Sequence, residues 1–200
     1  MDIGVIALTF AAIFVVELPD KTFIAALVLS TRYQPLMVWL GVGLAFLIQT
    51  AIGVTAGQLA TLLPQTLIHI VALAIFLIGA VVLFRSAPGA EEEELEAEEE
   101  YAARATDTRT GLKALTASFL VLFAAEWGDL SQLLTISLVA KYEKPFSVFF
   151  GAWAALLTVS GLAVLAGRVL MRYIKPSLLH YVGAAVCLVL AAVTLYGLVA

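Results

Sequence analysis

The sequence predicts an all-α polytopic membrane protein with six transmembrane helices arranged as two inverted three-helix repeats. Three observations lead to this prediction: an apolar composition, long stretches without charge, and a motif that occurs twice. Hydrophobic residues make up 62% of the chain and charged residues 13%. A soluble domain has about half apolar and a quarter charged residues, so this composition indicates a chain that lies largely in a lipid bilayer.

Charged residues are missing from stretches long enough to cross a bilayer. No Asp, Glu, Lys or Arg occurs between Arg32 and Arg85, between Lys144 and Arg168, or after Lys175. Uncharged apolar runs of about 18 or more residues are typical of transmembrane helices. The strands of a membrane barrel would be shorter and would alternate, and these runs do neither, so we expect helices.

The apolar runs are separated by polar or proline-containing breaks such as "TRYQP", "TLLPQ" and "KYEKP", which end helices. The first and fourth runs are longer than the roughly 20 residues that a bilayer core requires. Each has acids beside a Pro or Gly near its middle, so we expect both helices to be broken at these acidic motifs. The expected helices are Ile3–Ser30, Pro35–Leu59, Gln65–Phe84, Leu112–Ala140, Pro145–Met171 and Pro176–Leu198.

A charged linker separates the two sets of three helices. Eight of the fifteen acids lie in "EEEELEAEEE", from Glu91 to Glu100. One interpretation is a solvated linker that includes a short surface helix, and the other is a sensor or lure for divalent cations. The chain thus divides into a first repeat at 1–84, an acidic linker at 85–111 and a second repeat at 112–200.

The two halves resemble each other in sequence. "ELPDKTF" from Glu17 aligns with "EWGDLSQ" from Glu126, 109 residues later. "PLMVWLG" aligns with "PFSVFFG", and "AGQ" with "AGR", both 110 residues later. Three matches in the same order indicate a duplication. Because each half has three helices, the second half enters the membrane inverted, as in many secondary transporters.

The charges of the loops predict the orientation. Alternate loops fall on two sides of the membrane, and one side carries only Lys141 and Lys144. The other carries eight basic residues, so we expect it to face the cytoplasm. Both termini then lie outside and the acidic linker lies inside, most simply in a bacterial inner (plasma) membrane. The eight basic residues are Arg32, Arg85, Arg104, Arg109, Lys113, Arg168, Arg172 and Lys175.

The acids inside the first and fourth helices are the candidate site. Glu17 and Asp20 are three residues apart, as are Glu126 and Asp129, so each pair is expected on one face of a helix. An ionisable group at this depth costs at least about 2.5 kcal/mol and usually marks an ion path. A structural ion pair between Glu17 and Lys21 is the alternative, although the second motif has no base nearby.

If the repeats are inverted, the four carboxylates can converge near the membrane midplane. Desolvation and mutual repulsion would keep some of them protonated, and a bound divalent cation would displace those protons. Oxygen ligands suit Mn²⁺, Ca²⁺ or Mg²⁺, so we expect a divalent cation/proton antiporter that exports Mn²⁺ or Ca²⁺ as its substrate and has no prosthetic group. An exporter of small organic cations or amino acids is the alternative. No His-Glu-x-x-His motif and no nucleophile–base pair suggests an enzyme, and no nucleic-acid partner is expected.

Backbone groups and other polar residues could assist these acids. Pro19 has no N–H and leaves the Val15 carbonyl without a helical partner, and Gly128 allows a bend that frees the Ala124 carbonyl. Lys21 could neutralise Glu17 when the site is empty. Four mid-helix residues either bond neighbouring helices or lie beside the ion: Gln49, Thr50, Thr158 and Ser160.

The duplicated Glu-x-Gly-Asp-(Lys/Arg)-(Thr/Ser) signature resembles that of the Golgi manganese/calcium–proton antiporters and their bacterial manganese-exporter relatives. The resemblance covers essentially the whole chain and departs from the signature at Pro19, which replaces Gly, and at Leu130, which replaces the base. It implies exchange of a divalent cation for protons, with the four carboxylates as ligands. It also implies secondary contacts from Thr22, Ser131 and Gln132.

Overall fold

The computed structural model describes residues 1–18, 20–105, 109–173 and 175–199, and in this part of the chain all regular structure is helical. Three helices begin with a proline, whose missing N–H is not needed in the first turn of a helix. The elements are α1 (Ile3–Glu17), α2 (Lys21–Arg32), α3 (Pro35–Ala60), α4 (Gln65–Ser86), the short 3₁₀ helix η1 (Ala87–Gly89), α5 (Ala90–Arg104), α6 (Gly111–Ala125), α7 (Leu130–Tyr142), α8 (Pro145–Tyr173) and α9 (Pro176–Val199).

The all-helical class is confirmed, and the number of candidate membrane spans lies between four and six. Four helices are long and apolar enough to cross a bilayer: α3, α4 with its continuation, α8 and α9. The other candidates are broken pairs. The axes of α1 and α2 differ by 71°, and those of α6 and α7 by 69°. Each pair counts as one span only if the chain continues across the membrane after the bend.

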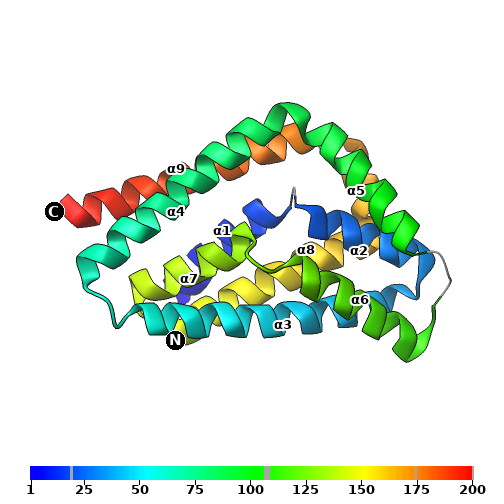
Figure 1. The fold of residues 1–200 in the computed structure, drawn as a ribbon, viewed down its shortest axis with the longest axis horizontal. Helices are drawn as coiled ribbons and strands as arrows, with labels where there is room; N and C mark the ends of the chain where they lie inside the picture. Colours follow the sequence, from blue (N-terminus) through cyan, green and yellow to red (C-terminus); the bar gives the residue numbers. More distant parts are fainter. Residues whose placement is uncertain (19, 106–108, 174, 200) are drawn as a thin grey trace.

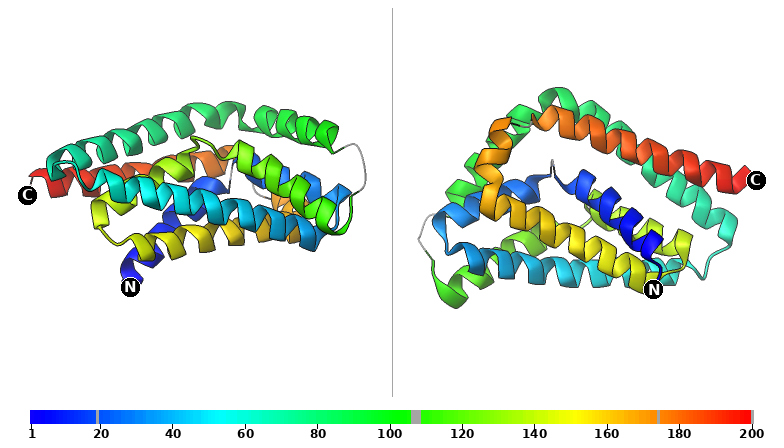
Figure 2. Two further views of the ribbon diagram at one scale, coloured as in Figure 1. Left: turned by 60° about the horizontal axis from the view of Figure 1, so that its bottom comes forward. Right: turned by 180° about the vertical axis from the view of Figure 1, so that it is seen from behind.

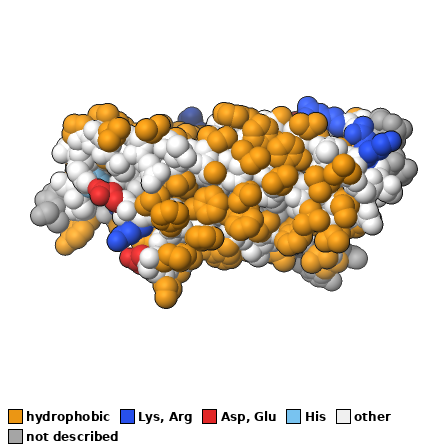
Figure 3. Space-filling model, turned by 90° about the horizontal axis from the view of Figure 1, so that it is seen from below, with side chains coloured by type: hydrophobic (Ala, Val, Ile, Leu, Met, Phe, Trp, Pro, Cys, Tyr) orange, Lys and Arg blue, Asp and Glu red, His pale blue; other side chains and the backbone are white. Residues whose placement is uncertain are grey.

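The helices form two groups in space. Helices α4 and α9 lie side by side as an inclined pair, and α1, α3, α6, α7 and α8 form a bundle beneath them (Figure 1). Both termini lie at one end of the long axis, and α5 lies toward the other end (Figures 1 and 2). Hydrophobic side chains cover the middle of the face drawn in Figure 3, whereas its visible charges gather toward the two ends. This distribution fits a long axis that runs across a bilayer.

Two close helix contacts hold the bundle together, and they occupy matching positions in the two halves. Helix α3 packs on α6, where a Cβ on Gly41 would lie 2.3 Å from the Leu115 carbonyl oxygen. Helix α8 packs on α1, where a Cβ on Gly151 would lie 2.6 Å from the Ile6 carbonyl oxygen. Only glycine permits backbones to approach this closely, so each half places a glycine of one helix against the backbone of a helix from the other half.

The acidic segment is a helix with one buried side. In α5, Ala90, Ala97 and Tyr101 are buried, and most of the glutamates are exposed. The buried residues recur at helical spacing, and the helix packs on α2 and more lightly on α9. The acidic segment is therefore part of the folded bundle as well as a connection between its halves.

Candidate cation-binding site

Each helix break is built by an aspartate that starts the next helix. The Asp20 carboxylate accepts a hydrogen bond from the backbone N–H of Thr22 at 3.1 Å, and Asp129 accepts one from Ser131 at 3.0 Å. Such bonds satisfy N–H groups that have no partner inside a helix. The predicted break at each acidic motif is present. The prediction that each Glu–Asp pair shares one face of a helix is wrong, because the glutamate stands at the end of one helix and the aspartate caps the next.

The second break depends on the backbone of Gly128. This residue has a φ of 77°, a left-handed conformation that L side chains rarely adopt. Its N–H donates to the Gln132 side-chain oxygen at 3.0 Å, so the carbonyl of Ala124 does not receive this proton as it would in a continuous helix. At the first break, the predicted role of Pro19 falls on a residue outside the described part of the chain.

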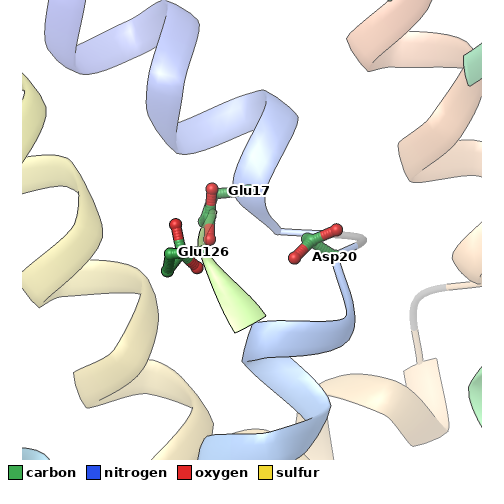
Figure 4. A group of neighbouring side chains, drawn as sticks. All are labelled: Glu17, Asp20 and Glu126. Carbon is green, nitrogen blue, oxygen red and sulfur yellow. The ribbon is translucent and has the colours of Figure 1, made fainter. Parts of the chain in front are cut away.

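Three of the four predicted carboxylates come together between the two breaks. Glu17, Asp20 and Glu126 each offer an oxygen, and these oxygens lie within 4.8 Å of one another. Figure 4 shows Glu17 and Glu126 side by side, with Asp20 at the turn that joins α1 to α2. Glu17 is completely buried and Glu126 is 2% exposed. Carboxylates from both halves thus meet at one point.

A hydroxyl group supports the glutamate in each half. The Thr22 hydroxyl oxygen lies 2.6 Å from Glu17 Oε1 and 3.1 Å from Asp20 Oδ2. The Ser131 hydroxyl oxygen lies 3.5 Å from Glu126 Oε2. Because a hydroxyl has one proton to donate, neither residue satisfies all the carboxylate oxygens around it.

The second oxygen of each glutamate has no partner. Glu17 Oε2 and Glu126 Oε1 are buried, and neither makes a hydrogen bond within the described residues. A buried carboxylate oxygen without a donor is costly. It needs either a proton of its own or a bound cation, so these two oxygens fit a site that alternates between the two.

The fourth carboxylate, Asp129, lines a cavity of about 430 Å³ together with Asp20. Three elements enclose it: the start of α2, the end of α6 and the last turns of α5. Ala124, whose carbonyl was a predicted ligand, also lines it. The remaining lining residues are Lys21, Thr22, Glu100, Tyr101, Arg104, Val121 and Ala125.

A pair of glutamines holds the second break in place. The Gln49 side chain donates to the Phe123 carbonyl at 2.9 Å and accepts from Gln132 at 2.9 Å. Gln132 in turn accepts from the Gly128 N–H. Both glutamines were predicted as possible contacts of the ion. In the structure their hydrogen bonds connect α3 to α7 beside the second motif.

The other candidate residues lie in different surroundings. Thr50 is buried with a hydroxyl that has no partner. Thr158 is exposed and bonds the Ala154 carbonyl of its own helix, and Ser160 bonds Leu157 in the same way. The Val15 carbonyl faces α9, 3.9 Å from the point where Gly183 would carry a Cβ. None of these four is among the residues that line the carboxylate cavity.

Lys21 and Leu130 stand at matching positions in the two motifs but face different helices. Leu130 packs against α4, 3.0 Å from the point where Gly79 would carry a Cβ. Lys21 is exposed and lines two cavities that α5 closes. It forms no ion pair with Glu17, since the one salt bridge among the described residues joins Arg104 to Glu100.

The contribution of α5 to the cavity was not predicted from the sequence. Tyr101, Glu100 and Arg104 follow or end a run of acids for which a solvated linker was one interpretation, yet all three line the same cavity as Asp20 and Asp129. The signal was present in the spacing of Ala90, Ala97 and Tyr101, which gives an otherwise acidic helix one apolar side. Such a side indicates that the helix packs on another element.

Comparison with known families gives this geometry a context. A model of the family described as divalent cation/proton antiporter GDT1 matches residues 5–91 and again residues 114–200. The chain belongs to this family. The predicted resemblance to a family of cation–proton antiporters is therefore confirmed.

Curated relatives of this chain include proteins from plants and from a cyanobacterium. The chain is 35% identical to the chloroplastic PAM71-homolog of Arabidopsis thaliana, over 94% of this chain and 58% of the relative. It is 34% identical to the chloroplastic GDT1-like protein 2 of rice, over 94% of this chain and 60% of the relative. A GDT1-like protein of Synechocystis is 32% identical, and the match covers 91% of this chain and 92% of that protein. The chain therefore spans about three fifths of these two plant relatives, and no solved structure matches it.

Proposed function

We propose that this GDT1-family protein exports Mn²⁺ or Ca²⁺ from the cytoplasm in exchange for protons, through a site formed by Glu17, Asp20, Glu126 and Asp129. The observation that carries the proposal is the meeting of Glu17 and Glu126. Both are buried, both have an unpartnered oxygen, and Asp20 lies within reach of the same ion. Hard divalent cations prefer such all-oxygen sites.

Exchange follows from the electrostatics of this cluster. Buried acids this close to one another cannot all be charged without a counter-ion, so the empty site holds protons. A divalent cation supplies the missing positive charge and releases those protons. The Thr22 and Ser131 hydroxyls adjust to either state, because a hydroxyl can donate to a carboxylate and can also accept from a protonated one.

We propose further that the chain crosses the membrane six times, as two inverted repeats joined by α5. Support comes from the family model, which matches both halves, and from the matching bends of 71° and 69°. The corresponding glycine contacts of α3 with α6 and of α8 with α1 also support it. The two halves then meet at the midplane, where transporters of this plan bind their substrates.

Transport by purified protein in liposomes tests the proposal. With a pH gradient across the membrane, wild-type protein should move Mn²⁺ or Ca²⁺, and Asp129→Asn should reduce this movement by at least about tenfold, the effect of losing roughly 1.4 kcal/mol of differential binding. Glu96→Gln is the matched control, since Glu96 is an exposed acid on α5 that does not line the cavity. Equal exchange by Asp129→Asn and wild type would rule out the four-carboxylate site. Transport of a small organic ammonium, with no transport of either metal, would favour the alternative exporter.

A further inference from the structure

We propose that α5 is a gate that controls access to the carboxylate site from the side on which α5 lies. In this gate, the side chains of Tyr101, Glu100 and Arg104 control passage of the cation. The inference rests on the proposed function, because it describes how the cation reaches Asp20 and Asp129.

A cavity beside the two aspartates is lined in part by α5. Asp20 and Asp129 line a space of about 430 Å³, and Glu100, Tyr101 and Arg104 of α5 line the same space. An ion that reaches the two aspartates from this direction must pass the C-terminal turns of α5. Glu100 is the acid that it would meet before them.

The packing of α5 holds its C-terminal turns beside this space. Tyr101 is 6% exposed and Ala97 is 4% exposed, both on the side of α5 that packs on α2. Glu100 and Arg104 form a salt bridge of 2.6 Å, and both are more than half exposed. The Arg104 guanidinium also lies 5.8 Å from the centre of the Tyr101 ring. Arg104 therefore offsets the charge of Glu100 and lies beside the Tyr101 ring, so in the proposed gate these three side chains act together.

The unequal contacts of the inclined α4–α9 pair support a gate in this place. Helix α4 packs on α7 and helix α9 packs on α1. The repeat relates α4 to α9, α7 to α2 and α1 to α6, so the equivalent contacts would join α9 to α2 and α4 to α6. In the described residues these two pairs make few contacts or none. On this side α2 packs on α5 instead. The core of the bundle is thus closed toward the termini and open toward α5, and α5 fills the opening.

The side chains at the two matching positions agree with this assignment. Leu130 is apolar and packs on α4, whereas Lys21 faces α5. A small second cavity brings Lys21 beside Glu93 and Glu94 of α5. Exposed charges attract one another within about a Debye length, roughly 8–10 Å, so in the proposed gate Lys21 attracts α5 without a direct ion pair and leaves the helix able to move.

Thiol accessibility tests the gate without measuring transport. Cys187 is the sole cysteine, so Cys187→Ala provides a background into which Val121→Cys introduces one thiol on the cavity wall. The protein is placed in lipid nanodiscs and labelled with an uncharged, sugar-linked methanethiosulfonate, whose local concentration does not depend on the charge of the variant, and the rate is followed by mass spectrometry. Nanodiscs expose both faces, so the result does not depend on the orientation of the chain.

Labelling should be slow in this background and at least about tenfold faster with Tyr101→Ala, because the rate follows the population in which the covering helix is open. Arg104→Glu should raise it as well, although less, and this exposed change does not threaten folding. Glu99→Ala is the control, an exposed neighbour that does not line the cavity, and it should change nothing. If Tyr101→Ala does not fold, the labelling rate of Arg104→Glu alone tests the gate.

Equal labelling rates in the background, Tyr101→Ala and Arg104→Glu proteins would overturn the gate, and so would rapid labelling of the background protein. If the variants are labelled faster but the wild-type protein moves neither Mn²⁺ nor Ca²⁺ in liposomes, the gate is supported and the proposed function is wrong. If the wild-type protein transports a cation but labelling is the same in all variants, the proposed function is supported and the gate is wrong.

Discussion

At the residue scale, one glycine and two glutamines determine how the second acidic motif is presented. Gly128 turns the chain with a positive φ, and Gln132 accepts the N–H that this turn leaves without a helical partner. Gln49 then connects Gln132 to the Phe123 carbonyl. The first motif has Phe23 in place of Gln132 and a proline in place of Gly128, so the two breaks are similar in angle but built from different residues.

Replacing Gly128 with alanine should destabilise the protein by about 1–2 kcal/mol, the cost of a left-handed conformation for a residue with a Cβ. There is open space around the position, with nothing within 4 Å of an added Cβ, so the cost is purely conformational. Gly89→Ala is the control, because that position has equal space and a φ of −101°. Thermal unfolding in detergent measures the difference, and equal melting temperatures for the two variants would contradict the strain argument.

The buried glutamates lead to a second prediction at this scale. Glu126→Gln removes one acid from a crowded cluster, so the variant should be at least as stable as wild type when no cation is present. Wild type should gain about 2.7 kcal/mol of stability from Mn²⁺ at a hundred times its dissociation constant. The variant should gain much less.

Thermal unfolding with and without Mn²⁺ measures this stabilisation. Glu96→Gln serves again as the exposed acidic control and should retain the full effect. Equal stabilisation of wild type and Glu126→Gln by Mn²⁺ would show that Glu126 is not a ligand.

At the scale of elements, close contacts between helices of different halves keep the two motifs together. Helix α1 ends at Glu17 and is held by Gly151 of α8, and helix α6 ends one residue before Glu126 and is held by Gly41 of α3. Each glutamate is therefore positioned by a contact made far back along its own helix. A shift of α1 or α6 would move a carboxylate away from the site.

Gly151→Ala should separate α1 from α8, since its Cβ would lie 2.6 Å from a backbone oxygen that cannot turn aside. The expected loss of stability is about 1–3 kcal/mol, the usual cost of overpacking. Gly197→Ala is the matched control, a helical glycine with nothing within 4 Å of an added Cβ, and it should be neutral or slightly stabilising. Similar melting temperatures for both variants would mean that α1 and α8 do not approach as closely as described.

At the scale of the whole molecule, the charge of the connecting segments distinguishes the two ends. The side that includes α5 carries eight basic residues, and the side with both termini carries two. We expect α5 in the cytoplasm, so that the gate would admit ions from there and the closed end of the bundle would face outward. The orientation of the chain therefore decides which side of the membrane the gate faces, and with it the side from which cations enter.

Reporters fused to the chain measure this orientation. An enzyme that is active only outside the cytoplasm should work when fused after Ala200, and an enzyme that is active only in the cytoplasm should work when inserted after Glu96 of α5. Activity of a cytoplasmic reporter after Ala200 would reverse the orientation and make the cation move through the gate in the opposite direction. The gate itself, tested in nanodiscs, would not be affected.

The sequence alone determined the class of the protein and the pairing of its acidic motifs. Long uncharged runs require helices, because a backbone in lipid must satisfy its own hydrogen bonds, and acids repeated at matching depth identify the candidate site. These are properties of composition and order along the chain. They do not depend on which helix packs on which.

The tertiary structure decided which groups share the site and what closes it. Spacing along the sequence suggested one face of a helix for Glu17 and Asp20, but a helix that stops between them puts one at an end and the other at a cap. The spacing of Ala90, Ala97 and Tyr101 indicates that one side of α5 is buried, but only the tertiary structure shows that this side packs on α2 and lies beside the site. Contacts between segments far apart in the chain depend on the shapes of both segments. The residue pattern of one segment does not identify the other segment on which it packs.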